Sequence, residues 1–507
     1  MSIIVIKCNH KKVNSNKCSN MLNVTLWIVV FLVSFISWFI FYVKKKHSYW
    51  ERQGIKGPKP LFLVGTTFAG VDKPIVEANR DFYKKFGNLY GLYDGLQAHL
   101  VVGDPELLRH ICVKDFHIFP QGFHFPSLHE IEKSFLINLY GEKWKRIRTL
   151  LTPTFSTGKI KRMFNLMKIC NKDAQLQLKN LTKSGEAQFD PKYFWGRYNM
   201  DVIAKCCFAT NLDVYSNEED VFLRNFIEFF QGNPLKLLCA AVFPGWFSRL
   251  LKLSLFPPKN LEFLRDLTLT LIENRKNGQN KADDFLQTLI DLETSTEDGD
   301  LNKAKLSTDE IVGASMISLV AGYETTSTLL TWSCYRLAKN PDIQEKLYQQ
   351  ISEVDLDDYE TLNSLSYLDA VISETLRIDA PIVLFQRLSH SDYKFPGTNV
   401  EIKKGTTISI PVYAIHHDPA NYPDPEVFDP QRFLDGSVKP FTFLPFGSGP
   451  RLCIGMRFAL INAKLSLAYL VKNYHIFTTD ATPSKIKYAR GSIILAAEDL
   501  KLGIKPR

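Results

Sequence analysis

A turn-rich decapeptide, Phe446-Gly447-Ser448-Gly449-Pro450-Arg451-Leu452-Cys453-Ile454-Gly455, lies near the C-terminus and precedes a strongly apolar helical pattern. Gly447 and Gly449 allow positive φ angles, so the backbone can turn sharply and come close to a flat ligand. Cys453 is the only cysteine of this decapeptide and stands at the entrance to the predicted helix. The pattern therefore predicts one cysteine sulfur on a turn that a planar group can approach.

The residues around Cys453 favour a thiolate that could bind a metal. The free N–H groups of Ile454 and Gly455 at the helix start can point at the sulfur and stabilise negative charge. Phe446 could cap the sulfur and keep water away. A lone, shielded thiolate suits a metal whose other ligands are not protein, and thiolate-ligated haem iron is such a case. Taken alone, Cys453 could equally be a buried structural cysteine.

The decapeptide resembles the haem-binding loop of the cytochrome P450 family, matching Phe-Gly-x-Gly-x-Arg-x-Cys-x-Gly at every fixed position. The resemblance implies the cytochrome P450 fold, which is mainly α with small β-sheets (α+β), in a single large haem-binding domain. It also implies haem b (iron protoporphyrin IX) as cofactor, with Cys453 as axial iron ligand and with Phe446 and Arg451 beside the haem. Residues 151–159 look especially like the microsomal clan that includes broad-specificity drug and xenobiotic oxidases.

Composition sets further bounds on the protein. The 507 residues are 45% hydrophobic, enough for a large core, and no composition shift marks a second domain. The formal net charge of +9 suggests a surface that meets anionic lipid or an acidic protein, and it is too diffuse to indicate nucleic-acid binding. The nine cysteines are irregularly spaced and include no Cys-x-x-Cys pair. We therefore expect a reducing compartment, and neither a disulfide framework nor a zinc or iron–sulfur site.

Residues 22–43 form an uncharged apolar run that predicts a transmembrane anchor. As a helix it would span about 33 Å, enough to cross the bilayer core. Residues 1–21 are a basic extension, residues 44–60 a basic and proline-rich hinge resembling that of microsomal family members, and residues 61–507 the catalytic haem domain. The lysines after the run favour a cytosolic catalytic domain, which together with the resemblance predicts a single-pass protein of the endoplasmic reticulum membrane.

Met21 directly precedes the apolar run. We therefore advance the hypothesis that translation starts at Met21 and that the extension before it is not translated. Recovery of a native peptide containing Asn14 would contradict this hypothesis.

Trp144 and Arg148 lie four residues apart on a predicted helix and so share one face. An indole N–H beside a guanidinium can bind one carboxylate, although a surface cation–π pair is the simpler reading. The pair resembles the family's Trp-x-x-x-Arg element, which implies contact with a haem propionate. The resemblance implies that Arg387 and Arg451 also bind the haem propionates. Lys143, Lys145 and Arg146 lie on other faces, where they could meet an acidic redox partner or only solvent.

A second motif, Ala321-Gly322-Tyr323-Glu324-Thr325, interrupts a helical pattern that begins with the capping-box sequence Ser307–Glu310 and ends at Lys339. Ala321 leaves room above a flat cofactor, and the Thr325 hydroxyl could open a groove in the helix and hold dioxygen and a water. A hydroxyl that bonds back to its own helix without further function is the alternative. The motif matches the family's Ala-Gly-x-Glu/Asp-Thr signature, which implies that Thr325 and Glu324 deliver protons during oxygen cleavage.

Glu374 and Arg377, with Arg432, match the family's Glu-x-x-Arg and Pro-x-Arg-Phe elements. We expect a buried triad that supports the cysteine loop and has a structural role.

The substrate side of the pocket is the least specific part of the sequence. We expect it to be shaped by residues 116–130 and 221–250 and by Ile317, Val320 and Leu384. The aromatic residues of 116–125 could instead form a packed loop, and the apolar residues of 221–258 could instead be core.

The predicted reaction is insertion of one oxygen atom of O2 into a lipophilic small molecule: a xenobiotic, steroid or fatty acid. Because no Gly-rich dinucleotide fingerprint occurs, electrons from NADPH should arrive through NADPH–cytochrome P450 reductase, with cytochrome b5 as a further candidate donor. A haem-thiolate isomerase or dehydratase would share Cys453 but would not need Glu324 or Thr325. A non-catalytic haem sensor would need neither these two residues nor an apolar access region.

Overall fold

The long helix predicted between residues 307 and 339 is present as α13 (Thr308–Lys339). Its predicted capping box is also present: Ser307 Oγ accepts from the Glu310 N–H, and the Glu310 carboxylate accepts from the Ser307 N–H. This exchange satisfies two of the N–H groups that a helix start leaves unpaired. The helix ends at Asn340, before Pro341 begins the next helix.

The structure is a computed structural model. It describes residues 5–507 except 71, 123–128, 213, 216–224, 227, 230–253, 255, 280–283, 294–304 and 491, with the side chains described from residue 23 onward. Most of the apolar segment 221–258 therefore lies outside the described residues.

Helices make up most of the described chain, which confirms the predicted mainly α class. The helices are α1 (Val5–His47), η1 (Glu51–Gln53), α2 (Ile75–Phe86), α3 (Pro105–Arg109), the π-helical turn η2 (His110–Lys114), α4 (Glu130–Lys133), α5 (Gly141–Leu151), η3 (Thr152–Phe155), α6 (Thr157–Leu181), α7 (Pro191–Phe208), α11 (Pro258–Lys276), α12 (Phe285–Asp291), α13, α14 (Pro341–Ile351), α15 (Tyr359–Ser364), α16 (Ser366–Ile378), α17 (Val412–His416), α18 (Gln431–Leu434), η4 (Gly449–Arg451) and α19 (Met456–Asn473).

The strands of the described residues form three small sheets, which confirms the prediction of small β-sheets. They are β1 (Leu89–Asp94), β2 (Gln97–Val102), β3 (Ala187–Phe189), β4 (Phe385–Leu388), β5 (Tyr393–Lys394), β6 (Glu401–Ile402), β7 (Thr407–Ile410), β8 (Tyr474–Phe477) and β9 (Leu502–Pro506). Their orders are β1-β2-β7-β4, β3-β9-β8 and β5-β6. In the largest sheet β2 runs parallel to β7, with His99 opposite Thr407, and its other pairs are antiparallel.

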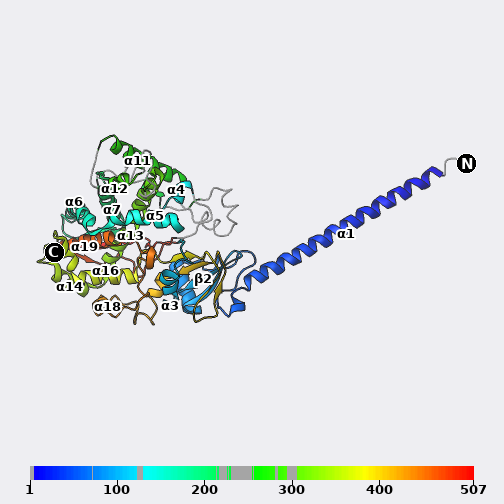
Figure 1. Ribbon diagram of the computed structural model, residues 1–507. Helices are drawn as coiled ribbons and strands as arrows, with labels where there is room; N and C mark the ends of the chain where they lie inside the picture. The colour runs from blue at the N-terminus through cyan, green and yellow to red at the C-terminus, as the bar shows by residue number, and fades with distance from the viewer. Residues whose placement is uncertain are drawn as a thin grey trace.

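α13 crosses the helical part of the body and packs against α7, α16 and α19 (Figure 1). Gly322 explains one of these contacts, because a Cβ on it would come within 3.0 Å of Ile203 Cδ1 on α7. α19 follows the cysteine loop, and much of it is buried in the same core. The two helices that carry the site motifs are therefore fixed in one hydrophobic core.

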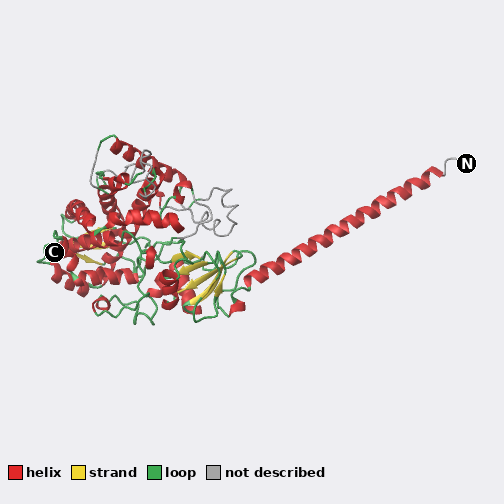
Figure 2. Ribbon diagram, in the orientation of Figure 1, coloured by secondary structure: helices red, strands yellow, loops and turns green. Residues whose placement is uncertain are grey.

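α1 projects away from the body beside the largest sheet (Figures 1 and 2). Asn23–His47 is long and apolar enough to cross a membrane, and its most apolar stretch of 18 residues has a mean hydropathy of 2.5. The chain that follows α1 packs against β1. Trp50 is 2% exposed, and its Nε1 donates a hydrogen bond to Leu92 O at 2.9 Å. The Gly91 N–H donates to Lys56 O, also at 2.9 Å. The hinge is thus fixed against β1.

Candidate active site

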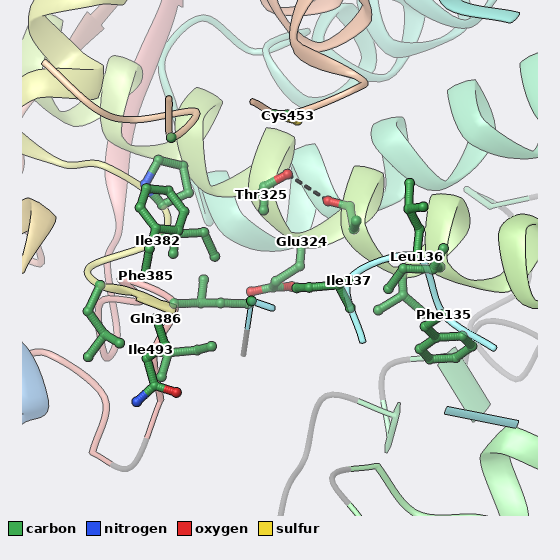
Figure 3. Close-up of a pocket in the computed structure, with 18 of the residues that line it drawn as sticks. Phe135, Leu136, Ile137, Glu324, Thr325, Ile382, Phe385, Gln386, Cys453 and Ile493 are labelled. Atoms are coloured by element: carbon green, nitrogen blue, oxygen red, sulfur yellow. Dashed lines mark hydrogen bonds between the residues drawn. The ribbon is translucent and has the colours of Figure 1, made fainter. Parts of the chain in front are cut away.

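A cavity of about 1810 Å³ lies between α13, the cysteine loop and β4. Phe135, Leu136, Phe229, Phe256 and Ile493 are among its apolar lining residues. Figure 3 shows Cys453 on one side of Thr325 and Glu324, with Ile137 and Ile493 on the other. All the site residues predicted from the sequence line this cavity: Trp144, Arg148, Ala321, Glu324, Thr325, Arg387, Phe446, Arg451 and Cys453.

The cysteine loop has the predicted tight geometry. Gly447 and Gly449 take φ angles of 75° and 71°, a region that favours glycine. Gly449 also packs so closely on the π-helical turn η2 that a Cβ would lie 1.9 Å from Cys112 O. The Cys453 N–H donates to Phe446 O at 2.9 Å and closes the loop.

Cys453 lies deep in the protein, yet its side chain is exposed to the cavity. Burial raises the pKa of its thiol, while the Gly455 N–H and the charge of Arg148 act in the opposite direction. The predicted N–H donor is therefore present at Gly455. Burial thus opposes the charged form of Cys453, so the predicted thiolate requires a ligand that stabilises the negative charge on the sulfur.

Three guanidinium groups, those of Arg148, Arg387 and Arg451, meet at the cavity wall. Burial, followed by the charges of Arg387 and Arg148, lowers the pKa of Arg451 to about 9. Burial also lowers the pKa of the other two arginines. Since guanidinium groups hold their protons tightly, the unfavourable energy of this cluster calls for an anionic ligand.

The available hydrogen-bonding partners do not neutralise this cluster. Arg451 Nε donates to Pro120 O at 2.8 Å, and Arg148 Nη2 donates to Leu452 O at 2.7 Å. Arg387 Nε is buried without a hydrogen-bond partner. Within the described parts of the chain, no aspartate or glutamate forms an ion pair with any of the three arginines.

Trp144 lies next to this cluster, 7% exposed. The Arg451 guanidinium carbon is 4.5 Å from the Trp144 ring centroid, a cation–π contact that no sequence motif indicated. Phe116 packs on Trp144 as well, with ring centroids 5.5 Å apart. Trp144 therefore orients Arg451 in addition to lining the cavity beside Arg148.

On α13, the Thr325 hydroxyl donates to Ala321 O at 2.6 Å, which is the back-bonded arrangement given above as the alternative (Figure 3). The hydroxyl oxygen keeps acceptor capacity, and Thr325 faces the cavity. The back-bond therefore fixes the position of the hydroxyl and leaves it able to contact a small ligand.

Glu324 has a partner that the sequence did not reveal. Lys192 Nζ, from the first turn of α7, lies 2.7 Å from Glu324 Oε1. The same ammonium is 3.0 Å from Ser327 Oγ and from Thr328 Oγ1, which lie on the same face of α13. One carboxylate at the cavity edge is thus held by a cation and adjoining hydroxyls.

The predicted supporting triad is present. Glu374 and Arg377 are fully buried and joined by two hydrogen bonds of 2.7 and 2.8 Å, and Arg432 Nε lies 3.5 Å from Glu374 Oε1. Burial raises the pKa of Glu374, although Arg377 acts to lower it.

His416, which no motif indicated, links this triad to the cysteine loop. Its Nδ1 lies 2.9 Å from Arg377 O, and its Nε2 accepts from the Leu444 N–H at 2.8 Å. Burial and the charge of Arg377 lower the pKa of His416 to about 3, so the ring is neutral and donates through Nδ1–H.

Of the predicted pocket-shaping residues, Ile317, Val320 and Leu384 line the cavity. Of segment 116–130, Gly122 lines the cavity, whereas Phe116 packs behind the lining residue Trp144 and Phe119 has the packed-loop position given as the alternative. Phe119 is fully buried against Tyr393 and Phe395. Residues 123–128 lie outside the described part of the chain, as does most of 221–250.

Arg146, considered above as a contact for a redox partner, has partners inside the protein. It pairs with Glu310 and donates to Lys305 O at 2.6 Å. Lys143 and Lys145 on the same helix are exposed.

Comparisons with known proteins point to one family. A family model described as Cytochrome P450 matches residues 55–504. The chain is 36% identical over 475 residues to cytochrome P450 3A16 of Mus musculus, covering 91% of this chain and 93% of that protein. It is 35% identical over 480 residues to cytochrome P450 3A11 of the same species, with coverages of 92% and 94%. It is also 36% identical over 495 residues to cytochrome P450 3A9 of Rattus norvegicus, with coverages of 94% and 96%.

Proposed function

Because this chain belongs to the cytochrome P450 family and is a monooxygenase, we propose that it inserts one oxygen atom of O2 into a lipophilic small molecule. NADPH would provide the electrons and the second oxygen atom would leave as water. The observation that carries this proposal is the cavity itself, where a lone cysteine and a cluster of uncompensated arginines share one apolar chamber.

The chemistry of the cavity wall fits haem, the cofactor that membership of the cytochrome P450 family implies, and we propose that this haem is haem b. Its two propionates would supply the negative charge that Arg148, Arg387 and Arg451 require, including a partner for the orphaned Arg387 Nε. Cys453 would hold the iron, and Ala321 would leave room for the flat ring. When bound, haem supplies the oxygen-activating chemistry.

The cysteine loop would keep the metal bond in place. Its N–H donor at Gly455 would moderate the charge on the sulfur, and Phe446 would shield it from water. Metal binding requires the Cys453 thiol to lose its proton, which burial opposes in the metal-free protein. Haem uptake is therefore coupled to deprotonation of Cys453.

We assign proton handling to Thr325 and Glu324. The Thr325 hydroxyl, held by Ala321 O, would accept or pass a proton at a fixed position facing the cavity. Glu324 would carry protons to the cavity from the side of α7, where Lys192 holds its carboxylate. This arrangement favours a monooxygenase over an isomerase or a sensor, because neither of those needs a proton path here.

The substrate would occupy the apolar remainder of the cavity, and its lining suits a xenobiotic, a steroid or a fatty acid. The cavity also reaches Leu63 and Val64, which lie close to the exposed apolar residues Leu61, Phe62 and Phe68. A substrate dissolved in lipid could therefore reach the cavity from the membrane side.

We further propose a single-pass anchor in the endoplasmic reticulum membrane, with the catalytic domain in the cytosol. The apolar segment Asn23–His47 and the basic residues at its end support this assignment. NADPH–cytochrome P450 reductase would deliver the electrons, and cytochrome b5 could act as a second donor. Lys143 and Lys145 on α5 remain available to an acidic partner.

A reconstituted system tests the function. Full-length protein, loaded with haem and mixed with the reductase, should consume NADPH in the presence of a lipophilic substrate and form a product containing one oxygen atom from isotopically labelled O2. Conversion of a peroxide substrate without NADPH would instead support the isomerase or dehydratase. Haem binding without turnover of any lipophilic compound would support the sensor.

A further inference from the structure

A second cavity, of about 540 Å³, lies where α1 meets the β1–β2 hairpin and the segment after β6. Its lining includes five basic residues, Lys45, Lys46, Arg52, Lys403 and Lys404, and among the described residues that line it there is no aspartate or glutamate. This cavity is therefore strongly positive, and the haem site does not use it.

Most of the positive charge is not neutralised within the protein. Lys403 pairs with Asp392 at 2.7 Å, and the other oxygen of that carboxylate accepts from the Lys404 N–H at 2.9 Å. The Lys46 ammonium lies over the Tyr42 ring, 5.7 Å from its centroid. In the described parts of the chain, the side chains of Lys45, Arg52 and Lys404 form no ion pair. Their charges remain available to an external anion.

The walls of this basic cavity are tied together, so the basic groups are held near one another before any ligand arrives. His47 Nε2 at the end of α1 lies 3.0 Å from Gly95 O in the hairpin turn. The Tyr49 hydroxyl donates to Glu401 O at 2.8 Å, and the Glu401 N–H donates to Gln53 Oε1 at 2.8 Å. Such preorganisation lowers the entropic cost of binding a ligand.

The depth of this cavity matches the head-group layer of a bilayer. The apolar part of α1 ends at Val43, directly before Lys44, and Tyr42 and Lys45 at that end line the cavity. Phe62 packs edge-on against Phe39 of α1, with ring centroids 6.2 Å apart, and is 49% exposed. The hydrocarbon layer would therefore cover Phe39 and Phe62, which leaves the basic cavity at the level of the lipid phosphates.

We propose that this basic cavity binds a phosphate group, and that its source is the head group of one anionic phospholipid. Lysine ammonium groups and the forked guanidinium of Arg52 are suited to phosphate oxygens. Basic pockets beside the end of a transmembrane helix recognise such head groups. The lipid would join the anchor to the catalytic body. This inference rests on the proposed membrane anchor.

The test uses full-length, haem-loaded protein in nanodiscs of phosphatidylcholine containing a small fraction of phosphatidic acid. Native mass spectrometry of the released protein should find one retained phosphatidic acid molecule. Arg52→Gln/Lys404→Gln should weaken this retention about tenfold, because it removes two charges of the cavity. The matched control is Lys172→Gln/Lys179→Gln, which removes two exposed lysines of α6, on the opposite side of the body from α1 (Figure 1). It should retain the lipid like the wild type.

Equal retention by the cavity variant and the wild type would overturn the proposal, as would equal weakening in both variants. Inorganic phosphate added to purely neutral nanodiscs distinguishes the two sources. Weak binding of inorganic phosphate would support a phospholipid head group as the source of the bound phosphate. Binding of inorganic phosphate as tight as that of phosphatidic acid would contradict that source. Retention of the protein in neutral nanodiscs tests the anchor separately, so failure of the anchor and failure of the cavity give different results.

Discussion

Lys192 Nζ lies 2.7 Å from Glu324 Oε1, joining the first turn of α7 to the middle of α13 at the edge of the main cavity. Because the ammonium also contacts Ser327 Oγ and Thr328 Oγ1, it holds the carboxylate in one position. If Glu324 carries protons, Lys192 is the residue that fixes the position of the Glu324 carboxylate relative to the cavity.

Glu324→Gln should lower kcat about tenfold or more, since the amide cannot transfer a proton. Lys192→Gln should have a smaller effect of the same sign, and both variants should keep the wild-type haem spectrum. Steady-state turnover with solvent deuterium isotope effects checks this. A wild-type kcat and isotope effect in Glu324→Gln would remove Glu324 from the mechanism.

Thr325→Ala should uncouple NADPH consumption from product formation and raise peroxide release about threefold or more, because the hydroxyl positioned by Ala321 O is lost. Thr331→Ala is the matched control, since Thr331 makes the same back-bond, to Ser327 O at 2.7 Å, but does not line the cavity. Peroxide formed per NADPH is the measurement. Unchanged coupling in Thr325→Ala would contradict the assignment.

Arg387→Leu should release haem about tenfold faster than the wild type, because a charge-assisted hydrogen bond to a propionate is lost. The haem-free variant should be at least as stable as haem-free wild type, since one of three buried like charges is gone. Haem transfer to an acceptor protein measures the rate. Arg265→Gln, an exposed residue of α11, serves as control. Unchanged haem release in Arg387→Leu would contradict its contact with a propionate.

His416→Gln should destabilise the protein by about 1–3 kcal/mol at pH 7.5, because it disturbs the links to Arg377 O and Leu444 N. His416 has a pKa of about 3 in the folded state and an ordinary value when unfolded. Below pH 6.5 the unfolded chain therefore binds a proton that the folded chain does not. The free energy of unfolding of the wild type consequently decreases as the pH is lowered.

The stability difference between wild type and His416→Gln should accordingly shrink between pH 6.5 and 4.5, by about 1.4 kcal/mol per pH unit. Chemical denaturation followed by tryptophan fluorescence measures it. A difference that does not change with pH would mean that His416 binds a proton as readily in the folded protein as in the unfolded chain, which would contradict its lowered pKa.

The parts of the site that were predictable from the sequence are local in the chain. The turn glycines before Cys453 and the capping box at Ser307 depend on residues a few positions apart, so their geometry follows from backbone chemistry. Lys192 and Glu324 are 132 residues apart, and only tertiary packing brings them together. The same holds for His416 and Leu444, which lie on separate segments.

Two features of the site could not be predicted from the sequence, and for the same physical reason. The aromatic residues at 116–119 carry no period that distinguishes pocket from core, and only the packing of Phe119 on Tyr393 and Phe395 decides between them. For Cys453, the N–H donor of Gly455 could be predicted, but the larger effect of burial on its pKa depends on the whole surrounding fold.

The central claim is that Cys453 holds haem iron through a thiolate. The reduced, carbon monoxide-bound absorption spectrum of the full-length protein tests it most directly. We predict a Soret band at the position typical of thiolate-ligated haem, and its movement to the position typical of histidine ligation in Cys453→His. A histidine-type Soret band in well-folded wild-type protein would contradict the account.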